Sequence, residues 1–217
     1  MILNIYKPKG LTSFSVVKTI RKFIGEKKVG HGGTLDPFAE GVLIIGTGKD
    51  TKALKNITDA DKTYIASIKL GKTTNTLDPE GDIIKKKKIP TLSDSKINKV
   101  LESFLGISMQ MPPMFSAKKV GGVKLYELAR KNIIIDRDPT QINITDISLI
   151  NYTETNITFT VSCSKGTYIR VLGKEIAEKL GTVGFLNSLI RTRVGEYFID
   201  YSVSPEQLKR SWKSYIH

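Results

Sequence analysis

Apolar and polar residues alternate with two different periods along this chain, and each period predicts a different kind of element. Residues 2–6 form a short apolar run, which predicts a strand. Over residues 14–24 the apolar side chains recur at helical spacing. We therefore expect a helix there, with Ser13 as its N-cap and Gly25 at its end.

The rest of the chain repeats both periods. Residues 63–70 alternate, with Tyr64 and the even positions after it on one face and mostly polar residues on the other, which predicts a half-buried strand. Residues 106–122 are rich in Met, Pro and Gly, and we expect an irregular excursion there. The other predicted elements are helices over 93–105, 123–131, 168–180 and 205–215, a hairpin of strands 141–150 and 156–163, and a strand pair near 189–199. This order favours an α+β domain around a largely antiparallel mixed sheet flanked by helices.

Composition narrows the class of protein. The apolar share of 40% is enough for a core, and no apolar stretch is long enough to predict a membrane span. No signal peptide is recognisable, so we expect a soluble, cytoplasmic protein. Cys163 is the only cysteine, and His31 and His217 are the only histidines. An internal disulfide is therefore excluded, and we expect no metal site.

The charge balance favours a polyanionic partner. Thirty-four Lys and Arg residues stand against 21 Asp and Glu residues, a formal net charge of +13. Basic proteins attract nucleic acid, although a lysine-rich chain with a solvated basic face has the same composition. The run Lys85–Lys88 fits the second explanation, as an exposed loop.

The most informative segment is a glycine-rich turn around one carboxylate. Asp36 follows His31 and the pair Gly32-Gly33, and it precedes Pro37 and a buried-looking apolar run. Proline restricts the residue before it to an extended backbone, and glycines allow a tight turn or a close ligand. Taken alone, this Asp-Pro step also fits an ordinary turn.

Two other segments carry weaker signals. Residues 66–73 match a relaxed phosphate-binding loop, but the match falls on the alternating strand rather than between a strand and a helix. Nucleotide hydrolysis is therefore not expected. Asp78-Pro79 repeats the Asp-Pro step without the preceding His and Gly-Gly, and we interpret it as a turn.

A series of motifs, in order along nearly the whole chain, resembles the bacterial TruB family of tRNA pseudouridine-55 synthases. They are Lys7-Pro8-x-Gly10-x-Thr12-Ser13, Gly30-His31-Gly32-Gly33-Thr34-Leu35-Asp36-Pro37, Lys62-Thr63-Tyr64, Thr74-x-Thr76-x-Asp78-x-x-Gly81, Pro112-Pro113-x-Phe115-Ser116-Ala117-x-Lys119, Gly166-Thr167-Tyr168-Ile169-Arg170 and Leu189-x-Arg191-Thr192-Arg193-Val194-Gly195. The chain differs from the family at Tyr6, where Asp is usual, and at Ile190, where a second Arg is common.

The resemblance implies a pseudouridine-synthase-like catalytic domain over residues 1–203. It implies an RNA-clamping insertion at about 106–122, and a short tail over 204–217 in place of a complete PUA domain. The implied reaction is isomerisation of uridine 55 in the TΨC loop of tRNA, after the base is flipped out of its stack. The implied partner is the tRNA TΨC stem-loop, bound by a monomer with no membrane, obligate protein partner or cofactor.

The same resemblance implies roles for single residues. Asp36 would be the essential carboxylate, Arg170 the cation beside it, and Tyr64 the ring that stacks on the target base and is a candidate for proton transfer at carbon 5. Taken without the family, Arg170 would be a surface arginine and Tyr64 a core tyrosine. The implied substrate-binding residues are His31, which fills the space left by the flipped base, Leu189 in the pocket wall, the phosphate-gripping Lys118 and Lys119, and Gly32, Lys7, Tyr168 and Arg191.

Two other functions remain open from the residues alone. The protein could assist tRNA folding by opening and releasing its elbow, or it could modify a different uridine or another RNA. The motifs describe the chemistry more than the site at which it is performed.

Overall fold

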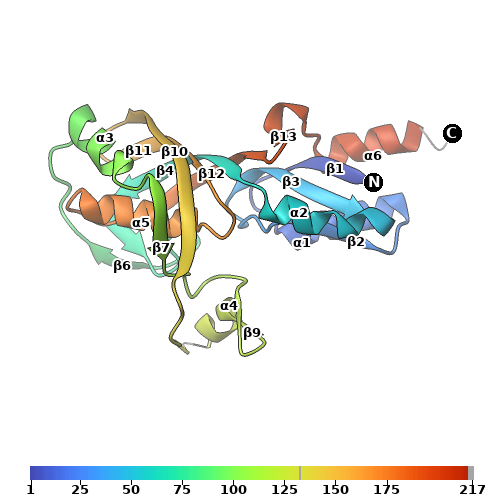
Figure 1. Cartoon of the computed structure of the whole chain (residues 1–217), viewed down its shortest axis with the longest axis horizontal. Coiled ribbons are helices and arrows are strands. Elements are labelled where there is room, and N and C mark those ends of the chain that lie inside the picture. The colour runs from blue at the N-terminus through green and yellow to red at the C-terminus, as the bar shows by residue number, and fades with distance from the viewer. Residues whose placement is uncertain (132, 215–217) are drawn as a thin grey trace. The chain divides into compact units, whose positions relative to one another are not determined.

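The computed structural model describes residues 1–131 and 133–214 (Figure 1). The chain divides into two compact units. Unit 1 consists of Met1–Tyr64 and the chain from Leu189 onward, and unit 2 consists of Ile65–Ser188. Two strands, β4 (Lys62–Leu70) and β12 (Gly184–Val194), begin in one unit and end in the other.

Unit 1 is built on strand β3 (Glu40–Thr47), which is buried on both faces. Its neighbours are β1 (Ile2–Lys7) and β2 (Val29–Gly32), both antiparallel to it, and β12, which runs parallel to it; β13 (Tyr197–Phe198) pairs with β12. The helices are α1 (Ser13–Ile24), α2 (Leu54–Asp59) and α6 (Pro205–Ser214), with short 3₁₀ turns at Gly48–Lys52 and Ile199–Tyr201.

The two faces of β3 pack against different helices. Leu43 and Ile45 join the apolar side chains of α1, whereas Val42 and Ile44 pack with Leu54 at the start of α2. Because successive side chains of a strand point to opposite faces, four consecutive apolar residues serve both layers. The run at 42–45 is therefore a central strand, and it places the end of the Asp36 loop in the core.

The strands of unit 2 pair in the order β12-β4-β11-β10-β7. A long hairpin, β10 (Thr140–Tyr152) with β11 (Asn156–Cys163), is flanked at the edge by β7 (Gly106–Gln110). The helices are α3 (Asp94–Glu102), α4 (Leu125–Ala129) and α5 (Ile169–Lys179), and the short ribbons pair β5 (Lys72–Thr74) with β6 (Ile83–Lys86) and β8 (Lys119–Val120) with β9 (Val123–Lys124). Within this unit, α4 and β9 lie beyond the end of the sheet (Figure 1).

Most of the predicted elements are confirmed. The structure contains the first strand, the helix over 14–24 with Gly25 in the left-handed conformation at its end, the half-buried strand β4, the long hairpin, α5, the β12–β13 pair and α6. The predicted end of the last helix, residue 215, lies outside the described residues. Lys85 and Lys86 are exposed as expected, although they belong to β6 rather than to a loop.

Three local predictions were wrong. Thr12, not Ser13, caps α1 by accepting the Ser15 N–H, because the Ser13 hydroxyl is engaged elsewhere. The segment over 106–122 is not irregular throughout, because β7 pairs with β10 and its exposed side chains conceal the alternation. The helix expected over 123–131 starts at Leu125, because Gly121 and Gly122 adopt positive φ and turn β8 back onto β9.

Among the described residues, no helix is long and apolar enough to cross a bilayer. The same part of the chain has no group of three or more His, Cys, Asp or Glu side chains placed to hold a metal ion.

Candidate active site

The candidate residues fall into two groups, one in each unit. In unit 1, Asp36 lies on the loop that joins the end of β2 at Gly32 to the start of β3 at Glu40. The loop turns at Pro37, where the Ala39 N–H donates to the Asp36 carbonyl over 3.1 Å. Gly33 has φ +87, a conformation that suits glycine, so the chain can reverse directly before the acidic residue. Asp36 is only partly buried.

Arg191, on β12, fixes the first half of the Asp36 loop. Its side chain is 1% exposed, and its guanidinium donates to three backbone carbonyls, those of Gly33 and Thr34 at 3.2 Å each and that of Val42 at 2.7 Å. Arg191 also stands opposite Gly41 in the parallel pairing of β12 with β3. The planar fork of an arginine thus joins the first half of the loop to the strand that follows it.

Ser13 and Lys7 fix the second half of the Asp36 loop. The Ser13 hydroxyl donates to the Leu35 carbonyl at 3.0 Å and accepts the Leu35 N–H at 2.9 Å. Lys7, 0% exposed, donates through its ammonium to the carbonyls of Leu11 at 2.7 Å, Pro8 at 3.0 Å and Pro37 at 3.4 Å. The residues on both sides of Asp36 are therefore fixed by buried donors.

We expected Lys7 and Arg191 to contact the substrate. In the structure both side chains are buried and bind backbone carbonyls of their own chain, at the loop or next to it. These hydrogen bonds fix the backbone on both sides of Asp36, and contact of either residue with substrate stays a prediction. A buried cation is stable only when such acceptors surround it, which explains why both are so completely hydrogen-bonded.

His31, at the end of β2, is held in its neutral form. Burial lowers its pKa, the nearby Arg191 guanidinium lowers it further, and a backbone hydrogen bond with Gly33 offsets part of the shift. A neutral imidazole can stack on bases without attracting phosphate. Its neighbour Gly32 is buried, and a Cβ there would lie 3.1 Å from a methyl group of Ile57.

Tyr64 and Leu189 lie on the adjacent strands β4 and β12, and both are buried, at 7% and 5% exposed. Tyr64 shares the buried face of β4 with Ala66, Ile68 and Leu70, as the alternation predicted. The two strands are joined nearby by the Thr192 hydroxyl, which donates to the Thr63 carbonyl at 3.2 Å. Both side chains thus belong to the core, which for Tyr64 is the simpler of the two interpretations given above.

In unit 2, Arg170 is buried near the start of α5 and is 5% exposed. Its Nη1 donates to the Thr76 carbonyl at 2.8 Å and its Nη2 to the Phe115 carbonyl at 2.7 Å. Nη1 also lies 3.4 Å from the carboxylate Oδ2 of Asp78. Arg170 is therefore not a surface residue, the alternative that its sequence position allowed.

Asp78 was missed as a site residue, since the sequence suggested an ordinary turn. It does form a turn: its Oδ1 accepts the Thr76 hydroxyl at 2.5 Å and the Glu80 N–H at 3.0 Å. The preceding Leu77 adopts φ +64, which is uncommon for a residue with a side chain and indicates a conformation fixed by its surroundings. Its place in a motif of the resemblance was the signal that could have identified it.

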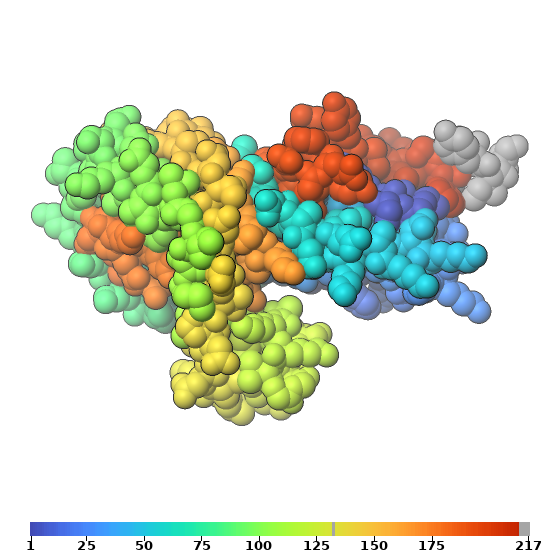
Figure 2. Space-filling model, viewed as in Figure 1, coloured from blue at the N-terminus to red at the C-terminus, as the bar shows by residue number. Residues whose placement is uncertain are grey.

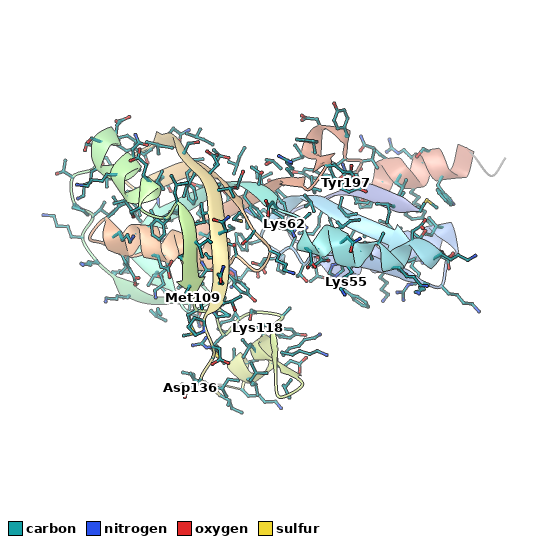
Figure 3. The ribbon with its side chains drawn as sticks, in the orientation of Figure 1. Lys55, Lys62, Met109, Lys118, Asp136 and Tyr197 are labelled. Atoms are coloured by element: carbon teal, nitrogen blue, oxygen red, sulfur yellow. The ribbon has the colours of Figure 1, made fainter. Side chains whose placement is uncertain are left out.

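The remaining candidates lie around the insertion. Tyr168 is half-buried and forms the N-cap of α5. Lys118 lies past the end of β7, near which Met109 is labelled (Figure 3). Its ammonium donates to the Thr140 hydroxyl at 2.9 Å. Lys119 is exposed on β8. The space-filling view shows the segment around β9 and α4 projecting from the rest of unit 2 (Figure 2).

The Asp36 carboxylate lies on a loop fixed from both sides, and the buried Arg170 is held by a second carboxylate, as expected for preorganised functional groups. Residues 21–169 match the family model described as TruB family pseudouridylate synthase (N terminal domain). The chain therefore belongs to the TruB family of pseudouridylate synthases.

Relatives and solved structures agree with this assignment. The chain is 44% identical over 202 residues to the tRNA pseudouridine synthase B of Mycoplasma mobile, covering 92% of this chain and 70% of the relative. It is 45% identical over 207 residues to the protein of the same name from Clostridium acetobutylicum, covering 95% and 71%. A solved Cbf5-Nop10-Gar1 complex contains a chain with TM-score 0.79 and 28% identity, of which this protein covers 55%.

A second solved structure, an H/ACA RNP bound to a substrate RNA containing 2'-deoxyuridine, has TM-score 0.74 and 25% identity over all of this chain and 55% of the other. These chains have the pseudouridine-synthase fold, and the predicted fold class is confirmed. The protein spans about 70% of the length of the two curated relatives and just over half of the solved chains.

Proposed function

We propose that this protein isomerises a uridine of tRNA to pseudouridine, at position 55 in the TΨC loop, with Asp36 as the essential carboxylate. The observation that carries the proposal is the Asp36 loop, which is fixed through Leu35, Pro37 and the carbonyls of Gly33 and Thr34 in a chain whose relatives are named tRNA pseudouridine synthase B.

The reaction is an isomerisation and needs no net change in composition. The bond between the sugar C1′ and the base N1 breaks, the base rotates, C1′ bonds to C5, and the C5 proton moves to N1. A fixed carboxylate serves each route open to Asp36, which are attack on the sugar, attack on the base and removal of a sugar proton. Fixing the reacting group before the substrate arrives removes an entropic cost that would otherwise slow the reaction.

We assign Arg170 the role of a fixed cation for the reacting groups and Tyr64 that of the ring that stacks on the base. The support for Arg170 is its burial and its rigid attachment to Thr76, Phe115 and Asp78. A buried charge needs such partners, and a guanidinium held in one place requires little rearrangement during the reaction. Tyr64 has an aromatic face of suitable size and is held on a regular strand.

Access to the base requires flipping, which costs a few kcal/mol of unstacking. His31, neutral at physiological pH because its pKa is lowered, is our candidate to occupy the space that the base leaves. The net charge of +13 and the exposed Lys119 favour contact with phosphates. These features agree with RNA as the substrate.

The test is to incubate the purified protein with unmodified tRNA transcript and to map pseudouridine by chemical derivatisation. We expect modification at uridine 55 and none in a transcript with cytidine at that position. Modification elsewhere would support a synthase with a different target. Tight binding with no modification in either transcript would contradict the proposal and favour a role in tRNA folding.

A further inference from the structure

Gln110 occupies the root of the insertion, at the last residue of β7, and its side chain is directed into unit 2. The residue is 2% exposed. Its amide oxygen accepts the Tyr168 N–H at 2.8 Å, and its amide nitrogen donates to the Tyr168 carbonyl at 3.3 Å. One side chain thus satisfies both backbone groups of a single residue.

Tyr168 is the residue from which α5 starts. It is the N-cap, its own side chain makes no capping hydrogen bond, and its carbonyl accepts the N–H groups of Val171 at 3.0 Å and Leu172 at 3.1 Å. Arg170 follows two residues later on the first turn. Because a helix is rigid over one turn, a displacement of the Tyr168 backbone moves the base of the Arg170 side chain with it.

The other end of the same arginine is attached to the segment that starts at Gln110. Its Nη2 donates to the Phe115 carbonyl, five residues further along the chain from Gln110. Between these points, Arg137 donates to the Pro112 carbonyl at 3.2 Å and ties the segment to the chain that returns to β10. The segment 110–115 therefore contacts α5 twice, once at its first residue and once at the guanidinium.

We propose that Gln110 is a positioning residue for Arg170, which couples the root of the insertion to the cation of the active site. Gln110 hydrogen-bonds both backbone groups of Tyr168, and on this account it acts on Arg170 through that backbone. The inference rests on the proposed function. If the insertion clamps RNA, tension on its root reaches Arg170 by this path, so that clamping and alignment of the cation occur together.

The test compares single-turnover pseudouridine formation with affinity for the TΨC stem-loop. Gln110→Met has a similar shape but removes both hydrogen bonds to Tyr168. We expect the rate constant at saturating RNA to fall about 10- to 100-fold, as small misalignments of catalytic groups do, with the dissociation constant changed less than about twofold. Gln141→Met, at an exposed neighbouring position on β10, is the control and should react like the unmutated protein.

Gln110→Glu provides a second readout that a loss of folding would not reproduce. An ionised Glu keeps the acceptor for the Tyr168 N–H but loses the donor, whereas a protonated Glu restores it. The rate of this variant relative to the unmutated protein should rise as pH falls. If Gln110→Met does not fold, this ratio decides the question.

The experiments distinguish failure of the positioning role of Gln110 from failure of the proposed function. Unchanged rates in both Gln110 variants, equal losses of rate and affinity, or a pH-independent ratio for Gln110→Glu would each overturn the positioning role while the proposed function stands. An unmutated protein that makes no pseudouridine would overturn the proposed function, and the inference would fall with it.

Discussion

The Nη1 atom of Arg170 lies 3.4 Å from the Oδ2 atom of Asp78, and both side chains are almost fully buried, at 5% and 6% exposed. The carboxylate is itself fixed by the Thr76 hydroxyl and the Glu80 N–H. A buried arginine beside such a carboxylate has one preferred position. Removing one partner of a buried pair leaves the other charge without compensation and is strongly destabilising.

Asp78→Asn should therefore weaken both the fold and the reaction. The amide can keep the contacts of Oδ1, but its NH₂ group would face the Arg170 guanidinium, donor against donor. We expect the free energy of unfolding to fall by about 3 kcal/mol and the single-turnover rate to fall at least tenfold, with tRNA affinity nearly unchanged. Chemical denaturation, rate and binding measurements check this. Asp82→Asn, in the exposed part of the same turn, is the control; an equally small effect of both substitutions would refute the assignment.

Asp78 shows where sequence reasoning reached its limit. The spacing Asp78-Pro79 predicts a turn correctly, but a turn residue and an ion-pair partner look alike when the partner, Arg170, is distant in sequence. The same holds for Ser13. Its position suggested a helix cap, and only the tertiary structure directs its hydroxyl to Leu35 instead.

Ser13→Ala should loosen the loop of Asp36. The Leu35 N–H and carbonyl would both lose their partner in a buried place, and we expect the free energy of unfolding to fall by about 2 kcal/mol. The reaction rate should fall while tRNA affinity is kept. Ser15→Ala is the matched control, because the partly exposed Ser15 hydroxyl donates to the Thr12 carbonyl in the same helix turn and not to the Asp36 loop. Thermal denaturation and single-turnover rates measure both effects; a Ser13→Ala protein as stable and active as the control would show that the loop does not depend on this anchor.

Gly41 permits the close approach of β3 to β12. It adopts φ +106, and an added Cβ would overlap the Arg191 carbonyl oxygen and lie 2.9 Å from the Arg191 nitrogen. Because backbone cannot move aside as a flexible side chain does, Gly41→Ala should destabilise the protein by about 3 kcal/mol or more.

Gly25→Ala separates the effect of backbone strain at positive φ from the effect of the clash with the Arg191 backbone. Gly25 also has positive φ, but a Cβ there meets nothing within 4 Å, so only the strained backbone remains, at a cost of about 1 kcal/mol. Denaturant titration of both variants measures the difference. Equal losses would mean that the contact with Arg191 is unimportant.

His31 should make stability depend on pH. Its folded-state pKa lies below the ordinary value of 6.5 because of burial and Arg191, so the unfolded chain takes up a proton first as the pH falls. The free energy of unfolding contributed by this residue is therefore fully present above about pH 6.5 and is lost below it, by at most about 1.4 kcal/mol per pH unit. Denaturation of the unmutated protein and of His31→Gln between pH 7.5 and pH 5 gives the difference, and equal slopes for the two proteins would contradict the assigned environment.

The periodicity of apolar residues was enough to predict most of the fold, but it predicted much less of the candidate site. Alternation identified β4 and β11, because each has one buried face and one partly exposed face. It indicated no strand at β7, whose Ile107 and Met109 are exposed, and it did not specify β3, which is buried on both faces. The motif around Asp36 marked the right loop, but the anchoring by Arg191, Lys7 and Ser13 is tertiary and has no local pattern.

The central claim is that Asp36, held by this loop, performs the isomerisation. The most direct test is single-turnover formation of pseudouridine at uridine 55 by Asp36→Asn, beside Asp50→Asn as a control at an exposed carboxylate. We predict no detectable product from Asp36→Asn, with melting temperature and tRNA affinity close to those of the unmutated protein, and a normal rate from Asp50→Asn. Pseudouridine formed at a comparable rate by the Asp36→Asn protein would contradict the account.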